Sequence, residues 1–506
     1  MRLVKVAGTR RADGRNSLPA LAMLAVLAAV HLALNFALTP NTPFPFSPDD
    51  FAFLGMGLQD LGWDWKRPVS ANIIFVVAAF GPGVSYFVLN ASALVVAWMV
   101  LLLLRDVFGV AVGVLATLVA GVLLFSHAAA FEHGKYLGLM TNLISHGFGL
   151  ASLLLLWRGW RNERVVPCLL GAFAYLASVL AKEDFVLPPL LFIGLLWAMD
   201  RAGAGAPAGR RPARAGLALL FLAIAVGSLA WHAYDGNPFV AGLFSPATSS
   251  RSYAVDLAPG AVLAAMRTLF LGYTPVATAL AGLACAGLWI GWPAQRLRLA
   301  WFVATVLALA APYALIPNNM PGYRAYAWLP WMAAIVALAL EAWRQRQAAG
   351  PAAARAAPVL VAVACAALAA SLHHEARMAL AARYAAGESV NRRMLELLER
   401  HRAELSDQPV IGLHGLDGPS PWCGNGPLYL ARKRDFGQRW IVFANAESAC
   451  YQTPRPGGRK PRYEPGLSVV PPARACAMES LPVLVFEADG SGRLARGREL
   501  CAEAGA

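Results

Sequence analysis

Long apolar stretches recur along the first three quarters of the chain, and they limit its possible folds more than any other feature. Of the 506 residues, 58% are hydrophobic and only 14% are charged. A helix of about 20 apolar residues crosses a hydrocarbon core of roughly 30 Å, and it bonds all its backbone polar groups internally. The sequence therefore predicts a polytopic α-helical membrane protein.

We expect about eleven transmembrane helices by this criterion. The first apolar run is longer than the roughly 7–15 residues of a signal-peptide core, and Pro-rich sequence follows it, so we interpret it as a retained span. Within 258–291, an interfacial helix is expected to precede the true span. The predicted spans are 18–38, 84–104, 109–127, 138–157, 165–181, 185–199, 215–233, 272–291, 299–317, 327–343 and 357–372.

The formal charge of +14 would suggest nucleic acid as the partner of a soluble protein. Here the basic residues instead alternate between Arg-rich and Arg-poor segments that separate the spans. The positive-inside rule places the Arg-rich set in the cytoplasm, together with the N-terminal segment 1–17. We therefore expect a bacterial-type inner (plasma) membrane protein with no nucleic-acid partner. The Arg-rich set comprises the N-terminus, Arg105, Arg158, Arg161, Arg164, Arg201, Arg210, Arg211, Arg214, Arg296, Arg298, Arg344, Arg346 and Arg355.

The last quarter of the chain, 373–506, is more polar and alternates helical with strand-like pieces. "GESVNRRMLELLERHRAEL" has helical spacing, whereas "PVIGLHGL", "RWIVFANA" and "PVLVFEA" are typical of short strands. An odd number of spans puts this segment in the periplasm. We therefore predict a transmembrane domain at 18–372 and a small soluble α/β domain at 373–506.

Four of the seven cysteines lie in this predicted domain: Cys423, Cys450, Cys476 and Cys501. An even number in one soluble segment predicts two disulfides in an oxidising compartment, with three possible connectivities. The other three lie in apolar runs and are interpreted as small core residues. A zinc site is disfavoured because the domain contains no C-x-x-C pair.

Two adjacent acids, Asp49 and Asp50, follow the first span in "TPNTPFPFSPDDFAFLG". One of them could cap a helix that begins at Phe51, since Ser-Pro-Asp-Asp is good helix-start chemistry. Two together at a membrane exit favour a functional site, because ionisable groups near membrane depth are costly. We take this pair as the candidate catalytic group.

Two further clusters fall on the same predicted outer face. "AKEDFVLPP" holds Lys182, Glu183 and Asp184 between two apolar helices, where a solvated turn is an equal alternative. "IPNNMPGYRAYAWLP" holds Arg324 and Tyr326; an aromatic belt explains the tyrosine, but not an arginine whose planar fork suits phosphate oxygens.

Three residues near the next outer loop, His127, Glu132 and His133, complete the candidates. They could ligate a metal or position an acceptor, although histidines near an interface are more often structural. A divalent cation on Asp50 and Glu132 is an option that the sequence does not require.

The order of these pieces resembles the GT-C membrane glycosyltransferases, especially the protein O-mannosyltransferase and tetratricopeptide O-mannosyltransferase-like branch. The resemblance covers about residues 18–345, and no tetratricopeptide array follows. The pieces that carry it are "SPDDFAF", "KRPVS", "VLNASALVVAW", Glu132, "KED" followed by Pro188, and "RAYAWLP".

The resemblance implies a GT-C-like fold, an extracytoplasmic site, a polyprenyl-phosphate-linked sugar donor and inversion at the anomeric carbon. Asp49 would be the base and Asp50 its partner or a metal ligand, with Arg324 and Lys182 on the donor phosphate. The acceptor would be a glycan, lipid or protein. Three alternatives stay open: a secondary transporter, a lipid-linked glycan polymerase or ligase, and a non-catalytic scaffold.

Overall fold

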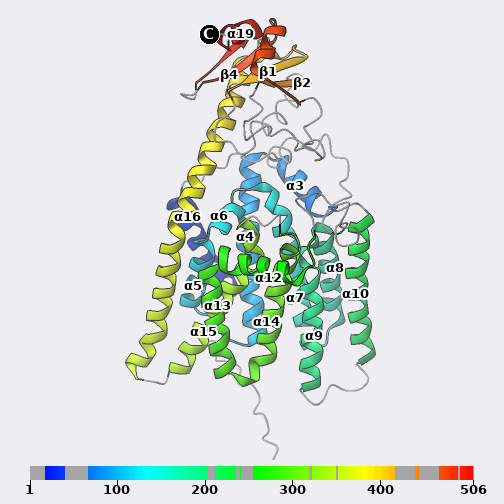
Figure 1. The fold of residues 1–506 in the computed structure, drawn as a ribbon. Coiled ribbons are helices and arrows are strands. Elements are labelled where there is room, and N and C mark those ends of the chain that lie inside the picture. The colour runs from blue at the N-terminus through cyan, green and yellow to red at the C-terminus, as the bar shows by residue number, and fades with distance from the viewer. Residues whose placement is uncertain are drawn as a thin grey trace, which may run out of the picture.

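The structure of the protein is a computed structural model, which shows a helical bundle carrying a small α/β domain on one long helix (Figure 1). It describes residues 18–39, 67–202, 211–234, 240, 255–317, 322–348, 351–415, 439–443, 467–487 and 491–504. The predicted membrane part and the predicted C-terminal domain are thus both represented.

Every one of the eleven predicted spans contains a helix. Within the described residues, six segments are long and apolar enough to cross a membrane, or seven if a bent pair counts as one span, so length and composition alone do not reach eleven there. The helices are α1 (Ala20–Leu32, continued by η1, Ala33–Ala37), α4 (Pro82–Phe108), α5 (Val114–Phe125), α7 (Met140–Arg161), α8 (Val165–Ala181), α9 (Leu187–Ala202), α10 (Arg211–Tyr234), α13 (Pro275–Gly291), α14 (Arg296–Ala314), α15 (Leu329–Gln347) and α16 (Ala352–Arg400).

Short elements connect these helices. They are α3 (Ser70–Ala78), α6 (Ala128–His133), η3 (Leu137–Leu139), η4 (Glu183–Phe185), α12 (Pro259–Arg267), η8 (Thr268–Tyr273), η9 (Pro293–Gln295) and η10 (Gly322–Ala327). The segment Pro259–Tyr273 meets α13 at a bend of 99°, and Figure 1 shows α12 lying across the bundle. The separate helix predicted before this span is therefore present.

The first half of α15 is enclosed by neighbouring helices. All its residues from Leu329 to Leu338 are buried, as expected of a helix that is apolar on every side. By contrast, α10, α13 and α16 carry exposed leucines, such as Leu219, Leu283 and Leu360. In a membrane protein these outer faces meet lipid, so the burial pattern agrees with the predicted class.

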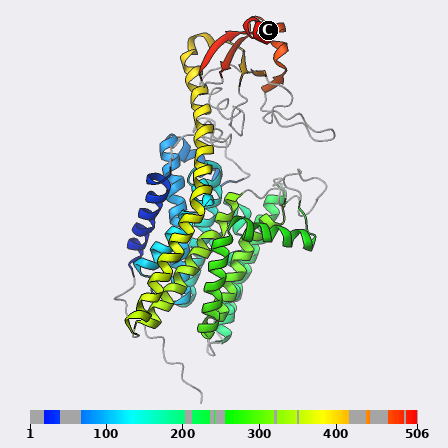
Figure 2. The ribbon, with the colours of Figure 1, turned by 60° about the vertical axis from the view of Figure 1, so that its left-hand side comes forward.

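The last predicted span and the predicted tail helix form one continuous helix, α16, of 49 residues. Figure 2 shows it running along the bundle and on to the C-terminal domain. The predicted boundary at residue 372 falls inside this helix, and the division into domains stays a prediction. Further along, the buried Leu397 packs so closely on Gly492 that a Cβ there would overlap its side chain.

The C-terminal domain is built on a five-stranded sheet of order β3-β2-β1-β4-β5, parallel except for the β4–β5 pair. The three predicted strands are confirmed as β1 (Val410–His414), β2 (Arg439–Phe443) and β4 (Pro482–Phe486). Two strands were not predicted, β3 (Leu467–Val470) and β5 (Gly492–Arg496). β5 carries two arginines in five residues, which hides its apolar alternation.

One of the predicted disulfides is present. Cys476 in η12 (Pro472–Ala477) is bonded to Cys501 in α19 (Gly497–Ala504). Cys423 and Cys450 lie outside the described residues, so the second pairing stays a prediction. The three cysteines of the apolar runs, Cys168, Cys285 and Cys365, are free.

Candidate functional site: a buried ion-pair cluster and its cavity

The turn between α8 and α9 is folded into the protein. Lys182 leaves α8 in an extended conformation and Glu183–Phe185 form one 3₁₀ turn, with Glu183, Asp184 and Phe185 all buried. Phe185 lies against Gly149 of α7, where any Cβ would overlap its ring. The solvated-turn interpretation of "KED" is therefore wrong.

Neighbouring hydroxyls hold the end of α8 in place. Ser70 donates to the carbonyl of Ala181 at 2.7 Å, and Ser145 donates to the carbonyl of Lys182 at 3.1 Å. At a helix end the last carbonyls lack partners within the helix, so these bonds satisfy groups that would otherwise be stranded. The backbone of the cluster is thus fixed from α3 and α7.

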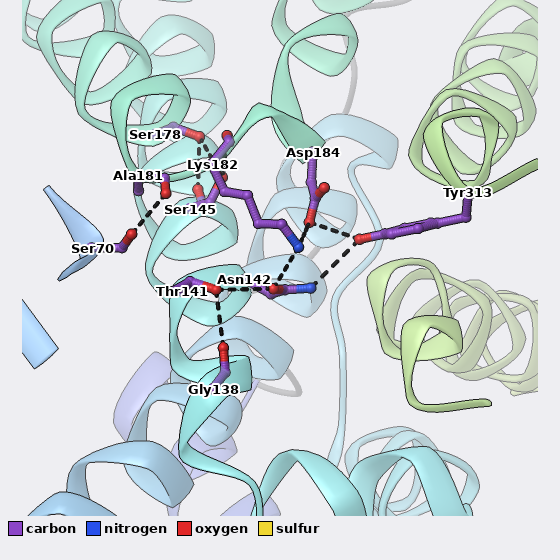
Figure 3. Close-up of polar contacts among 10 residues, drawn as sticks. All are labelled: Ser70, Gly138, Thr141, Asn142, Ser145, Ser178, Ala181, Lys182, Asp184 and Tyr313. Carbon is purple, nitrogen blue, oxygen red and sulfur yellow. Dashed lines mark hydrogen bonds and ion pairs between the residues drawn. The ribbon is translucent and has the colours of Figure 1, made fainter. Parts of the chain in front are cut away.

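The side chains of this turn form a connected network (Figure 3). Lys182 Nζ lies 2.9 Å from Asp184 Oδ2 and donates to Asn142 Oδ1 at 2.8 Å. The hydroxyl of Tyr313 on α14 donates to the same Asp184 oxygen at 2.7 Å. Asn142 is supported in turn by Thr141, whose hydroxyl donates to its Oδ1 at 3.2 Å. Three helices therefore position one ion pair.

Burial and the neighbouring charges shift the pKa values of Lys182 and Asp184 in opposite directions. Burial alone would raise the pKa of Asp184, but Lys182, His146 and the Tyr313 hydrogen bond together lower it. Burial lowers the pKa of Lys182, and Asp184 opposes that shift. We interpret the pair as ionised, because each charge is the main compensation for the other.

Arg324 reaches the same place from η10. It is 8% exposed, and its Cζ lies 4.8 Å from the centre of the Tyr313 ring. A guanidinium over an aromatic face is held by the ring quadrupole. Tyr313 therefore contacts both charged groups, Asp184 through its hydroxyl and Arg324 through its ring.

A cavity of about 140 Å³ lies between these groups. Glu183 also borders it; this side chain is 9% exposed, and its Oε2 has no hydrogen-bond partner among the described residues. The cavity is lined by Arg67, Tyr136, Gly138, Leu139, Thr141, Asn142, Lys182, Glu183, Asp184, Pro312, Tyr313, Ile316, Tyr323 and Arg324.

The structure brings together only part of the predicted site. Lys182, Glu183, Asp184 and Arg324 share the cavity, although 140 residues separate the acidic turn from the arginine in sequence (324 − 184 = 140). Asp49 and Asp50 lie outside the described residues. Their place beside the cavity stays a prediction.

The remaining candidates have other surroundings. Tyr326 donates to the carbonyl of Ala93 at 2.9 Å and stacks on His133 at 4.3 Å between ring centres. Burial lowers the pKa of His133 to about 3, so that ring is neutral. Glu132 accepts from Tyr384 of α16 at 3.5 Å. Within the described part of the chain, no group of three His, Cys, Asp or Glu side chains could hold a metal ion.

Sequence reasoning missed Tyr313 and Asn142. The signal was available, since each is a polar residue inside a predicted apolar span, where such residues are costly and often functional. Tyr313 also follows Pro312, a proline inside α14 that lies two residues before its end at Ala314 and lacks the backbone N–H of other residues. Neither residue is charged, whereas charge in apolar surroundings is the signal that singles out Lys182 and Arg324.

The described members of the predicted Arg-rich set gather at the opposite end of the bundle. Arg105, Arg158 and Arg161 border one surface cavity there, and Arg346 bonds the end of α13. In Figure 1 the end of α15 and the start of α16 lie at this end, away from the C-terminal domain. The segregation agrees with the positive-inside pattern, while the side that faces the cytoplasm stays a prediction.

Solved structures that this chain resembles include ArnT from Cupriavidus metallidurans in the apo state and the same protein bound to undecaprenyl phosphate. Each is 15% identical to this chain over 92% of both chains, with TM-scores of 0.45 and 0.46 respectively. No family model and no curated protein matches the sequence. The predicted O-mannosyltransferase branch gains no support, and the site is interpreted from its own residues.

Proposed function

We propose that the protein is an inverting glycosyltransferase that takes its sugar from a polyprenyl-phosphate donor and passes it to a glycan, lipid or protein acceptor on the outer side of the membrane. The observation that carries the proposal is the cavity shared by Arg324 and Lys182, two cations held in fixed positions at the end of the bundle nearer the C-terminal domain. The order of motifs that resembles GT-C enzymes supports it independently.

The cavity suits a phosphate rather than a whole sugar lipid. Its volume of about 140 Å³ is below the roughly 300–1,000 Å³ of pockets that enclose a complete small-molecule ligand. Of the charged groups that line it, Arg67, Lys182 and Arg324 outnumber Glu183 and Asp184 by one. We therefore assign the donor phosphate to this space and place the sugar beyond it.

The two cations would act differently. Lys182 has three N–H donors, of which Asp184 and Asn142 accept two; the third has no acceptor among the described residues. Arg324 offers a planar fork, which matches phosphate oxygens in pairs. As the bond between sugar and phosphate breaks, these donors would stabilise the charge that develops on the leaving phosphate.

A carboxylate completes the reaction. The acceptor hydroxyl loses a proton as its oxygen attacks an oxocarbenium-like carbon, so a base must stand on the face opposite the phosphate. We assign this role to Asp49, with Asp50 as its partner or as a metal ligand. Asp184 is a poor candidate because Lys182 and Tyr313 already occupy its Oδ2.

The test is transfer of radiolabel from a polyprenyl-phosphate sugar to membrane acceptors by the purified protein. Arg324→Gln should slow transfer about a hundred- to a thousand-fold, as loss of one charge-stabilising donor does. Asp49→Asn should slow it about a hundred- to ten-thousand-fold. Arg267→Gln is the matched control, since Arg267 is exposed on α12 away from the cavity. Equal rates for wild type, Arg324→Gln and Asp49→Asn would end the proposal.

A further inference from the structure

A second cavity, of about 430 Å³, lies at the Arg-rich end of the bundle, where α7 ends and α8 and α10 begin. Its walls are mostly apolar, and Leu169, Leu217 and Leu220 contribute to them. Trp160, Arg164 and Arg214 border it as well. It shares no residue with the cavity of the proposed active site.

The apolar part of this cavity is a groove between α8 and α10. Leu169 is 44% and Leu220 38% exposed, so the groove is open on the outer face of the bundle. Deeper between the two helices, Tyr175 stacks on Phe221 with ring centres 5.2 Å apart and closes the space. From Arg214 to Phe221 the rise along α10 is roughly 10 Å, at about 1.5 Å per residue.

A fixed guanidinium stands at one end of the groove. Arg214 is ion-paired with Asp200, and its Cζ lies 4.7 Å from the centre of the Trp160 ring. The indole N–H of Trp160 donates to the same carboxylate oxygen at 3.1 Å. Arg214 is therefore positioned before any ligand arrives, which lowers the entropy cost of binding one.

The surroundings of this end are positive. Arg164 is exposed at the rim of the cavity, beside Glu163. Of the charged side chains that the structure describes at the helix ends meeting there, five are basic and two acidic, a surplus of three positive charges. They are Arg158, Arg161, Arg164, Arg201 and Arg214 against Glu163 and Asp200.

We propose that this cavity binds one anionic phospholipid of the surrounding membrane, with an acyl chain in the groove between α8 and α10 and the phosphate against Arg164 and Arg214. An apolar groove open to the lipid-facing side, with basic residues and a tryptophan at its mouth, matches the two parts of such a lipid. The proposal does not depend on the glycosyltransferase assignment.

Gly216 allows a direct test. It borders the cavity, and a Cβ built on it meets no atom within 4 Å, so a larger side chain fits without disturbing the protein. Gly216→Leu should therefore fill the space that the acyl chain needs. Gly227 is the matched control, because it lies on the same helix, has equally open surroundings and does not border the cavity.

The experiment is native mass spectrometry of the full-length protein in detergent, titrated with phosphatidylglycerol or with phosphatidylcholine of the same acyl chains. Wild type and Gly227→Leu should bind phosphatidylglycerol more tightly than phosphatidylcholine. Gly216→Leu should lose the bound lipid, and Arg164→Gln should weaken phosphatidylglycerol binding about five-fold, the effect expected of one basic residue at an anionic surface. Unchanged elution and thermal unfolding would show that both glycine variants are folded.

Three results would overturn the proposal. Gly216→Leu that keeps its bound phosphatidylglycerol would place the lipid elsewhere. Equal affinity for phosphatidylglycerol and phosphatidylcholine would show that the groove binds acyl chains but does not recognise an anionic headgroup. Displacement of the lipid by millimolar inorganic phosphate would make the site one for soluble anions.

Discussion

Tyr313 makes two separable contacts, and substituting it tests how the proposed phosphate site is held together. Its hydroxyl donates to Asp184 at 2.7 Å, while its ring lies 4.8 Å from Cζ of Arg324. Tyr313→Phe removes the hydroxyl and keeps the ring. Tyr313→Leu removes both.

The two contributions have different sizes. A hydrogen bond to a charged group contributes about 1.5–3 kcal/mol, so Tyr313→Phe should lower kcat/KM about ten- to a hundred-fold as Asp184 and Lys182 lose their alignment. A desolvated cation–π contact contributes about 0.5–2 kcal/mol, so Tyr313→Leu should lose a further two- to thirty-fold. That additional loss should raise the KM for the donor and also lower kcat, because Arg324 binds the donor phosphate in the ground state and stabilises the charge that develops on it in the transition state.

Initial rates of label transfer at several donor concentrations measure both effects. Tyr175→Phe is the control: its hydroxyl also donates inside the bundle, to the carbonyl of Val186 at 2.6 Å, but it does not border the cavity. If Tyr313→Phe transfers label as fast as wild type, the hydroxyl does not support the site. If the Phe and Leu variants have the same KM, the ring does not position Arg324.

Three further predictions concern other parts of the molecule. Lys135 and Glu388 form an ion pair in which the side chains are 2% and 4% exposed. Lys135→Met should destabilise the protein by about 3–5 kcal/mol, because it removes the lysine charge that compensates the buried Glu388 carboxylate. Thermal unfolding should show that adding Glu388→Leu restores most of this loss. A double variant no more stable than the single one would contradict this. Cys501→Ala should lower the stability of the C-terminal domain by about 3 kcal/mol, because the Cys476–Cys501 bond closes a loop 25 residues long. Limited proteolysis should then cut the domain at a lower temperature than in wild type. Burial raises the pKa of Glu132 to about 7. Protonated Glu132 therefore adds to the free energy of unfolding; this contribution is complete below about pH 4.5 and should be lost as the pH rises through 7. Glu132→Gln should flatten this dependence, and an identical pH profile for wild type and variant would refute it.

The membrane class and the helix positions could be predicted because they depend on local composition. Each predicted range contains a helix, and the separate helix before α13 is present. Errors arose where a local signal was weak or shared between elements. The arginines of β5 hide its alternation, and the continuous α16 shows no break at residue 372.

The site was predictable only in part. Arg324 and Lys182 stand out as charges in apolar surroundings, so the sequence pointed to both. Nothing in their spacing says that they border one cavity, because that depends on how α8, α14 and η10 pack. The acids Asp49 and Asp50 lie outside the described residues, and their role rests on the motif order and on the proposed chemistry.

The amino-acid sequence alone determined that this chain is a membrane protein, because burying so much apolar side chain requires lipid and because helices satisfy their own backbone groups there. It also predicted the Arg-rich segments, whose described members gather at one end of the bundle. Only the tertiary structure decided that Asp184 would be neutralised by Lys182 and bonded by Tyr313, and would share one cavity with Arg324. Partners so far apart in sequence meet through packing, and the energy of a buried charge depends on which partners it meets.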